Sequence, residues 1–197
     1  MIDQEYDSLQ SVDGLPRDDA THASADHDDL SFIDRFVGRW WAIYTRARNE
    51  KIVAAFLDAA EVSYFLPIVR HGRSTRARVQ YVDLPLFPGY LFICGDSHAR
   101  LAALKTNRVA KVLEVSDQEK LKSDLAQIHR LLDSGEPVDL FPNLCRGARC
   151  RVRSGVLAGL EGVVLRRRGM WRVYISVEFI GQSAELEVDS AMVEIID

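Results

Sequence analysis

Two strand-like segments of this chain are apolar on both faces, and this feature restricts its possible folds most. The segments are RWWAIYT, residues 39–45, and YLFIC, residues 90–94. Successive side chains of a strand point to opposite faces of a sheet. In the first segment this alternation sets Trp40, Ala42 and Tyr44 against Trp41 and Ile43, and in the second it sets Tyr90 and Phe92 against Leu91 and Ile93. A sheet that contains both segments needs an apolar cover on each side.

The region from Gly38 to Pro137 alternates between strand and helix patterns. We expect strands over 39–45, 62–69 and 109–115, and a bent strand that runs from VQYVDL through residues 84–94. A helix follows Asn49, a short helix begins at Ser97, and a third follows the capping box of Ser116 and Glu119. The order β-α-β-β-α-β plus a third helix is typical of the split βαβ, ferredoxin-like arrangement.

Apolar spacing assigns the buried faces of the first and third helices. After the expected N-cap Asn49, the residues that recur on one face are Ile52, Phe56 and Ala60, with Val53 and Leu57 beside them. The third helix buries Leu121, Leu125, Ile128, Leu131 and Leu132, and Gly135 with Pro137 ends it.

The second face of the expected sheet has two possible covers. A two-layer split βαβ unit buries only the face beneath its helices. The other face is covered either by the third helix or by another protein, and an aromatic patch left open there would be a protein-interaction site.

The C-terminal part is punctuated by glycine turns. After a linker over 136–145, residues 146–197 contain five short strand patterns, at 148–153, 162–167, 171–180, 183–188 and 191–196. Five such strands favour a small closed barrel, because closure removes exposed edges. The predicted fold class is therefore α+β, a ferredoxin-like domain over 38–135 followed by an SH3-like five-stranded β-barrel.

The first 37 residues differ from the rest in charge. They carry ten acidic residues and two arginines, although the whole chain has a net charge of only −4. The segment lacks apolar periodicity, so we expect an acidic disordered extension. It is either a solvated tail or an arm that competes with nucleic acid for basic surfaces.

Neither export nor a membrane is indicated. The N-terminus is acidic where a secretory signal would be basic and then apolar. The three cysteines, at no metal spacing, indicate reduced thiols in a cytoplasm. No apolar run is long enough to cross a bilayer, and we expect a monomer.

No catalytic constellation stands out. The histidines outside the acidic extension, His71, His98 and His129, have no spacing that would pair them as zinc ligands. There is no GxSxG, P-loop or dinucleotide-binding glycine pattern. We therefore expect no enzyme, no metal and no cofactor.

A basic segment interrupts the first domain. Residues 70–78, RHGRSTRAR, contain Arg70, Arg73, Arg76 and Arg78 without an acid. The segment is either a solvated loop or a salt-sensitive contact with nucleic-acid phosphates. The cluster Arg166–Arg168 either contacts RNA or only keeps the barrel soluble.

Several of these segments together resemble a known family. RWWAIYT and PLFPGYLF are similar to the N-terminal domain of NusG transcription elongation factors, and RGARCRVRSGVLAGLEGVVLRR resembles their KOW barrel. The resemblance covers residues 38–197. It implies a factor that grips the clamp helices of the largest RNA polymerase subunit through an aromatic cavity and suppresses pausing or termination.

The resemblance also implies the residues for these contacts. The polymerase-binding residues would be Tyr44, Phe87, Tyr90 and Phe92. The residues facing the non-template DNA strand would be Arg46, the 70–78 loop and Arg108. The KOW barrel would recruit a small-subunit ribosomal protein or the Rho terminator through Phe179 and Ile180.

Residues 45–73 are similar to RfaH and its relatives, the specialised paralogues of polysaccharide-operon antitermination. Gly89 instead agrees with housekeeping NusG. RfaH can refold its second domain as a helical hairpin. In this chain, residues 148–196 are rich in β-branched residues and turns, which favours the barrel. Two alternatives stay open: a housekeeping NusG-type factor, and an RNA-binding or ribosome-associated KOW module.

Overall fold

The computed structural model describes residues 32–74, 79–143, 145–167 and 169–196. Its N-terminal unit, residues 32–135, contains one four-stranded antiparallel sheet with the order β2-β5-β1-β6. The strands are β1 (Arg39–Thr45), β2 (Tyr64–Phe65), β5 (Tyr90–Gly95) and β6 (Val109–Glu114). The helices are α1 (Glu50–Ala59), α2 (Ser97–Lys105) and α3 (Gln118–Asp133). This strand order agrees with the predicted split βαβ unit, since β1 and β5 occupy the centre.

The two central strands are buried on both faces, as the alternation predicts. Trp41, Ile43, Leu91 and Ile93 form one core with residues of α1 and α2. Trp40, Ala42, Phe92 and Cys94 form another with α3. The sequence predicted that either the third helix or another protein covers the second face of the sheet. In the structure, α3 covers it.

Helix α1 is turned relative to its predicted orientation. Val53, Ala54 and Leu57 are buried, whereas Ile52 and Phe56 are exposed. Asn49 makes no side-chain cap, and its amide Nδ2 donates to the Ala47 carbonyl oxygen at 2.9 Å. The predicted stripe of Ile52, Phe56 and Ala60 is therefore wrong as a buried face.

The third helix begins one residue later than the predicted Ser116 cap implies, at Gln118. Asp117, not Ser116, is the N-cap, and its Oδ1 accepts a hydrogen bond from the Lys120 N–H at 2.9 Å. Leu121, Leu125 and Ile128 are buried as predicted.

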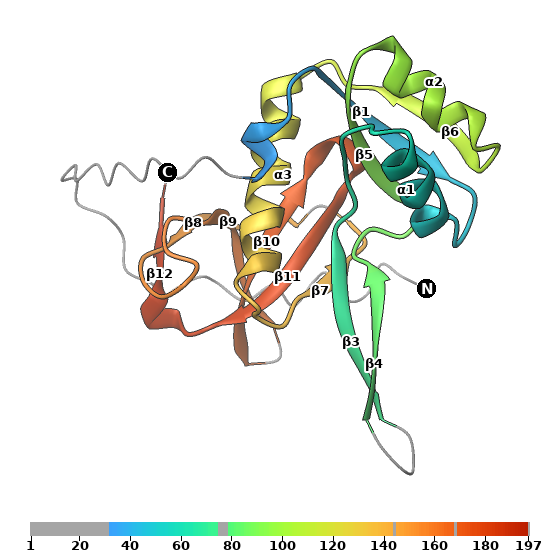
Figure 1. Ribbon diagram of the computed structural model, residues 1–197. Coiled ribbons are helices and arrows are strands. Elements are labelled where there is room, and N and C mark those ends of the chain that lie inside the picture. Colours follow the sequence, from blue (N-terminus) through green and yellow to red (C-terminus); the bar gives the residue numbers. More distant parts are fainter. Residues whose placement is uncertain (1–31, 75–78, 144, 168, 197) are drawn as a thin grey trace, which may run out of the picture.

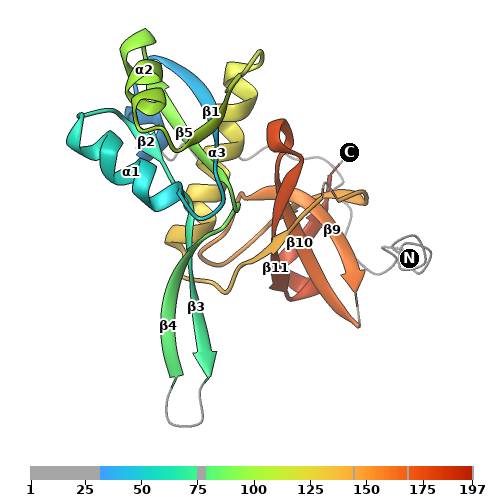
Figure 2. The same cartoon turned by 90° about the vertical axis from the view of Figure 1, so that its right-hand side faces the viewer.

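The predicted bent strand is two strands, and residues 70–74 of the predicted basic loop belong to a strand. β3 (Ile68–Ser74) pairs with β4 (Val79–Pro85) in a separate two-stranded sheet. A turn over residues 86–89 then leads into β5. The β3–β4 hairpin projects away from both sheets (Figures 1 and 2).

The C-terminal unit is a six-stranded antiparallel sheet with the order β12-β8-β9-β10-β11-β7. Its strands are β7 (Asp139–Phe141), β8 (Ala148–Val152), β9 (Glu161–Arg167), β10 (Met170–Val177), β11 (Gln182–Val188) and β12 (Val193–Ile195). Two 3₁₀ turns, η2 (Glu178–Ile180) and η3 (Ser190–Met192), join the last strands. All five predicted strands appear, and β7 adds a sixth from the predicted linker. Closure into a barrel stays a prediction.

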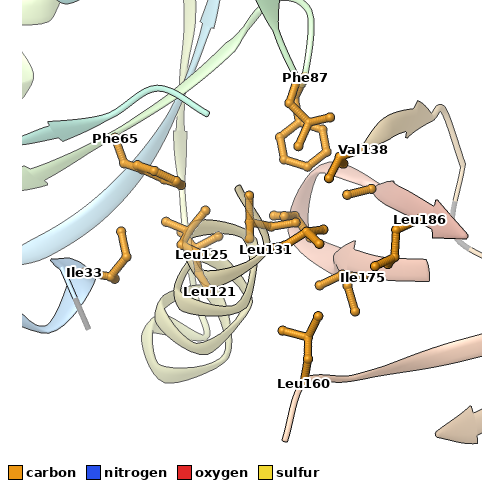
Figure 3. Close-up of a cluster of buried hydrophobic side chains, with 14 of the residues drawn as sticks. Ile33, Phe65, Phe87, Leu121, Leu125, Leu131, Val138, Leu160, Ile175 and Leu186 are labelled. Atoms are coloured by element: carbon orange, nitrogen blue, oxygen red, sulfur yellow. The ribbon is translucent and has the colours of Figure 1, made fainter. Parts of the chain in front are cut away.

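Helix α3 connects the cores of the two units (Figure 3). A single apolar cluster runs from Ile33 and Phe65, through the leucines of α3, to Ile175 and Leu186 of the C-terminal sheet. Because such burial is the main stabilising term in folding, the two units are packed together here rather than separated by a free linker.

The described part of the chain begins before Gly38. Residues Phe32–Arg35 form a 3₁₀ turn, η1, with Ile33 completely buried. Phe32 stacks on His129 with ring centroids 5.0 Å apart, and Asp34 Oδ1 lies 2.9 Å from Lys122 Nζ. The prediction of disorder is therefore wrong for 32–37, and residues 1–31 lie outside the described part. Within the described ranges, no helix is long and apolar enough to span a membrane.

Candidate functional site

Tyr44 and Tyr90 form an accessible aromatic pair at one end of the N-terminal sheet. They are register partners on β1 and β5, and their ring centroids lie 5.1 Å apart. Tyr44 is 43% exposed, whereas Tyr90 is half-buried against the core of α3. Burial, and then the neighbouring Tyr44, raise the pKa of the Tyr90 phenol. This pair can offer amphipathic ring surface to a partner.

The turn at Gly89 positions Tyr44. Gly89 has φ +85°, and a Cβ there would lie 2.9 Å from Tyr44 Cε2. Its N–H donates to the buried carboxylate of Glu50, and its carbonyl oxygen accepts from the Thr45 N–H at 2.8 Å. The sequence analysis did not single out Glu50, because its contact with Gly89 joins residues that are far apart in the chain.

Phe87 and Phe92 are completely buried. Phe92 belongs to the sheet face beneath α3, and Phe87 faces Val138 in the segment that enters β7 (Figure 3). Of the four residues predicted to contact the polymerase, only Tyr44 and Tyr90 are therefore accessible in this conformation. The chain's own helix and C-terminal unit occupy the remainder of the predicted cavity.

A polar stripe on α3 holds the C-terminal unit. Asp124 Oδ2 accepts from the Glu178 N–H at 3.0 Å, and Asp124 Oδ1 accepts from Lys120 Nζ at 2.8 Å. Lys120 Nζ also lies 3.1 Å from Glu178 Oε1. Burial raises the pKa of Asp124, although the Lys120 ammonium opposes this shift.

Two further bonds extend this stripe. Gln127 Oε1 accepts from the Glu161 N–H at 2.9 Å, and an Arg130 nitrogen donates to the Ala158 carbonyl oxygen at 2.8 Å. The backbone groups at 158, 161 and 178 belong to the strand-rich form of the C-terminal unit, so α3 binds that form.

The predicted partner-binding residues of the second domain lie beside this contact. Phe179 is exposed, and Ile180 is half-buried against the shared core. Both belong to η2, whose first residue, Glu178, bonds to α3.

The predicted nucleic-acid residues fall into two groups. Arg46 and Arg108 are exposed and adjacent, since the Arg46 N–H donates to the Arg108 carbonyl oxygen at 2.8 Å. Arg70 is exposed on the hairpin, with its guanidinium carbon 5.0 Å from the centroid of the Tyr81 ring. Arg73 lies on β3, but its side chain, like Arg76 and Arg78, is outside the described part.

Among the residues that the structure describes, no three His, Cys, Asp or Glu side chains gather as a metal site would require. The three cysteines are free, and burial raises the pKa of Cys145 to about 11 and that of Cys150 to about 12. These thiols are therefore protonated at neutral pH, which disfavours nucleophilic chemistry.

Comparison with known proteins shows a similarity to one family. Residues 38–131 match the family model described as "Transcription termination factor nusG". The solved structure "Domain interaction in Thermotoga maritima NusG" is similar, with 17% identity over 81% of this chain and 97% of that chain and a TM-score of 0.45.

A second similar structure is the MjSpt4:Spt5 complex in conformation A. It has 16% identity, covers 80% of this chain and 98% of that chain, and gives a TM-score of 0.26. The search of curated proteins gave no match. Over residues 38–131 the chain is therefore similar to the NusG family, whose model is described as a transcription factor.

Proposed function

We propose that this protein is a transcription elongation and antitermination factor that binds the clamp helices of RNA polymerase. The observation that carries the proposal is the accessible Tyr44–Tyr90 pair within a NusG family domain. Burying such rings stabilises a complex by about 1.5–3 kcal/mol each before association costs are subtracted.

The full contact requires a rearrangement of the chain. Phe87 is next to the pair, because the Tyr90 N–H donates to the Phe87 carbonyl oxygen at 3.0 Å, but Val138 covers its side chain. In our proposal the C-terminal unit leaves α3 when polymerase binds. This movement exposes Phe87 to the polymerase and frees Phe179 and Ile180 for a ribosomal protein or Rho. Phe92 then contributes from beneath, as support for the neighbouring rings.

Co-purification with RNA polymerase tests the docking site. The double variant Tyr44→Ala plus Tyr90→Ala should reduce polymerase retention at least about 10-fold, since 1.4 kcal/mol corresponds to that factor. Phe56→Ala is the matched control, because this exposed ring lies on α1, which packs on the opposite sheet face. Equal retention by the double variant and the wild type, with unchanged unfolding midpoints, would contradict the proposal.

We further propose that the arginines contact the non-template DNA strand and that the role is operon-specific, as in RfaH. The projecting β3–β4 hairpin supports this, because an extended basic arm can reach DNA beside the bound domain. Mapping the chromosomal occupancy of the tagged protein distinguishes the roles. A few operons should be enriched, whereas occupancy of every transcribed gene would indicate the housekeeping function.

A further inference from the structure

The β3–β4 hairpin presents an aromatic ring and a guanidinium on one of its faces. Directly paired residues of an antiparallel ladder share a face. Arg70 pairs with Asp83, and Gly72 pairs with Tyr81, so these four positions lie on the same side of the hairpin. Arg70 and Tyr81 are diagonal neighbours there, with the guanidinium carbon 5.0 Å from the ring centroid.

The ring of Tyr81 is open to a ligand. Tyr81 is 63% exposed even with the Arg70 contact, which makes it a large apolar side chain left in solvent. Its cross-strand partner is Gly72, which has no side chain to lie over the ring. The presence of this exposed ring is not explained by fold stability, because the ring buries little apolar surface and so stabilises the fold little.

The surrounding charge favours an anionic ligand. Residues 68–85 contain four arginines and one acid, Asp83. Asp83 faces Arg70 across the ladder, and Lys51 Nζ donates to the Asp83 carbonyl oxygen at 2.6 Å, which brings another cation to this end.

We propose that Tyr81 and Arg70 form a stacking site for one base of single-stranded nucleic acid. The Tyr81 ring offers its π-face to an unpaired base, and Arg70 supplies a cation to the adjacent phosphate. A base in a duplex has no free face, so the site selects a single strand over a duplex. This deepens the proposed function, in which the single strand is the non-template DNA. The sequence alone missed Tyr81, because it lies beyond the arginine-rich segment.

Fluorescence anisotropy of the full chain with a short labelled oligothymidylate tests the site. We expect Tyr81→Leu to weaken binding about 10-fold, since a stacked base contributes about 1–3 kcal/mol. Tyr81→Phe should bind within about twofold of the wild type, and Tyr81→Trp at least as tightly, because both keep a π-face. Val82→Ala is the matched control, since Val82 is exposed on the opposite face of the same strand.

Three results would overturn the site: no binding of the oligothymidylate, equal affinity for a duplex of the same length, or unchanged affinity in Tyr81→Leu. Polymerase co-purification by Tyr81→Leu separates this inference from the proposed function and should equal that of the wild type. If that variant loses polymerase but keeps its oligonucleotide affinity, Tyr81 contacts protein instead. If the Tyr44→Ala plus Tyr90→Ala variant still retains polymerase, the proposed docking site is wrong. The oligonucleotide measurement then still tests the Tyr81 site, because it does not involve polymerase.

Discussion

The backbone N–H of Glu178 donates a hydrogen bond to Oδ2 of Asp124 at 3.0 Å, and this bond joins the last helix of the N-terminal unit to the C-terminal sheet. Asp124 is almost completely buried, and Lys120 takes its other oxygen. The carboxylate therefore satisfies one backbone donor and one ammonium at the same contact.

Replacing Asp124 tests how much this contact holds the two units together. Asp124→Ala leaves the Glu178 N–H without its acceptor and removes one partner of Lys120, so we expect a loss of about 1–3 kcal/mol in the free energy of unfolding. Urea denaturation followed by circular dichroism measures this loss. Asp133→Ala, at an exposed position of the same helix, is the control and should change stability little.

Gly89→Ala should displace Tyr44. The substitution strains a backbone with φ +85° and places a Cβ 2.9 Å from the Tyr44 ring. Gly155→Ala is the matched control, because it has φ +82° but no atom within 4 Å of the added Cβ. Both variants should lose about 1–2 kcal/mol from the left-handed conformation, but only Gly89→Ala should also lose polymerase retention. Equal retention by the two would contradict a positioning role for Gly89.

The 3₁₀ turn η1 is expected to be part of the stable fold. Ile33 is completely buried beside α3, so Ile33→Ala should lower the free energy of unfolding by about 2–5 kcal/mol. Phe32→Ala removes a larger but exposed side chain and should cost less. A null effect of Ile33→Ala in the same denaturation experiment would mean that η1 is not tied to the core.

Tyr174 predicts an alkaline loss of stability. Burial, and then the nearby Glu185, raise the pKa of its phenol from 10.0 to about 12. The unfolded chain releases this proton first, so stability declines as pH rises from about 10 to about 12, by up to about 2–3 kcal/mol. Urea unfolding at a series of alkaline pH values should show a shallower decline for Tyr174→Phe than for the wild type. Parallel pH curves for the two proteins would show that the phenol does not titrate as expected.

Local sequence patterns were sufficient for much of the fold. The alternation in residues 39–45 and 90–94 predicted a sheet covered on both sides, and Leu121, Leu125 and Ile128 predicted the buried face of α3. These patterns succeed because strand and helix periods are properties of the backbone. The same reasoning failed for Ile52 and Phe56, since an i, i+4 stripe does not say how far a helix is rotated about its axis.

The sequence alone was sufficient to recognise the apolar periodicity, the glycine turns and the basic segment. It also carried the family resemblance from which Tyr44 and Tyr90 were predicted as contact residues. Tertiary structure decided which of those aromatic residues are accessible: Phe87 is covered by Val138, and Phe92 lies beneath α3. It also placed Asp124 against Glu178 and Arg70 against Tyr81. Burial and cross-strand contacts depend on which segments, distant in the chain, come together in the fold. A local sequence pattern contains no information about those contacts.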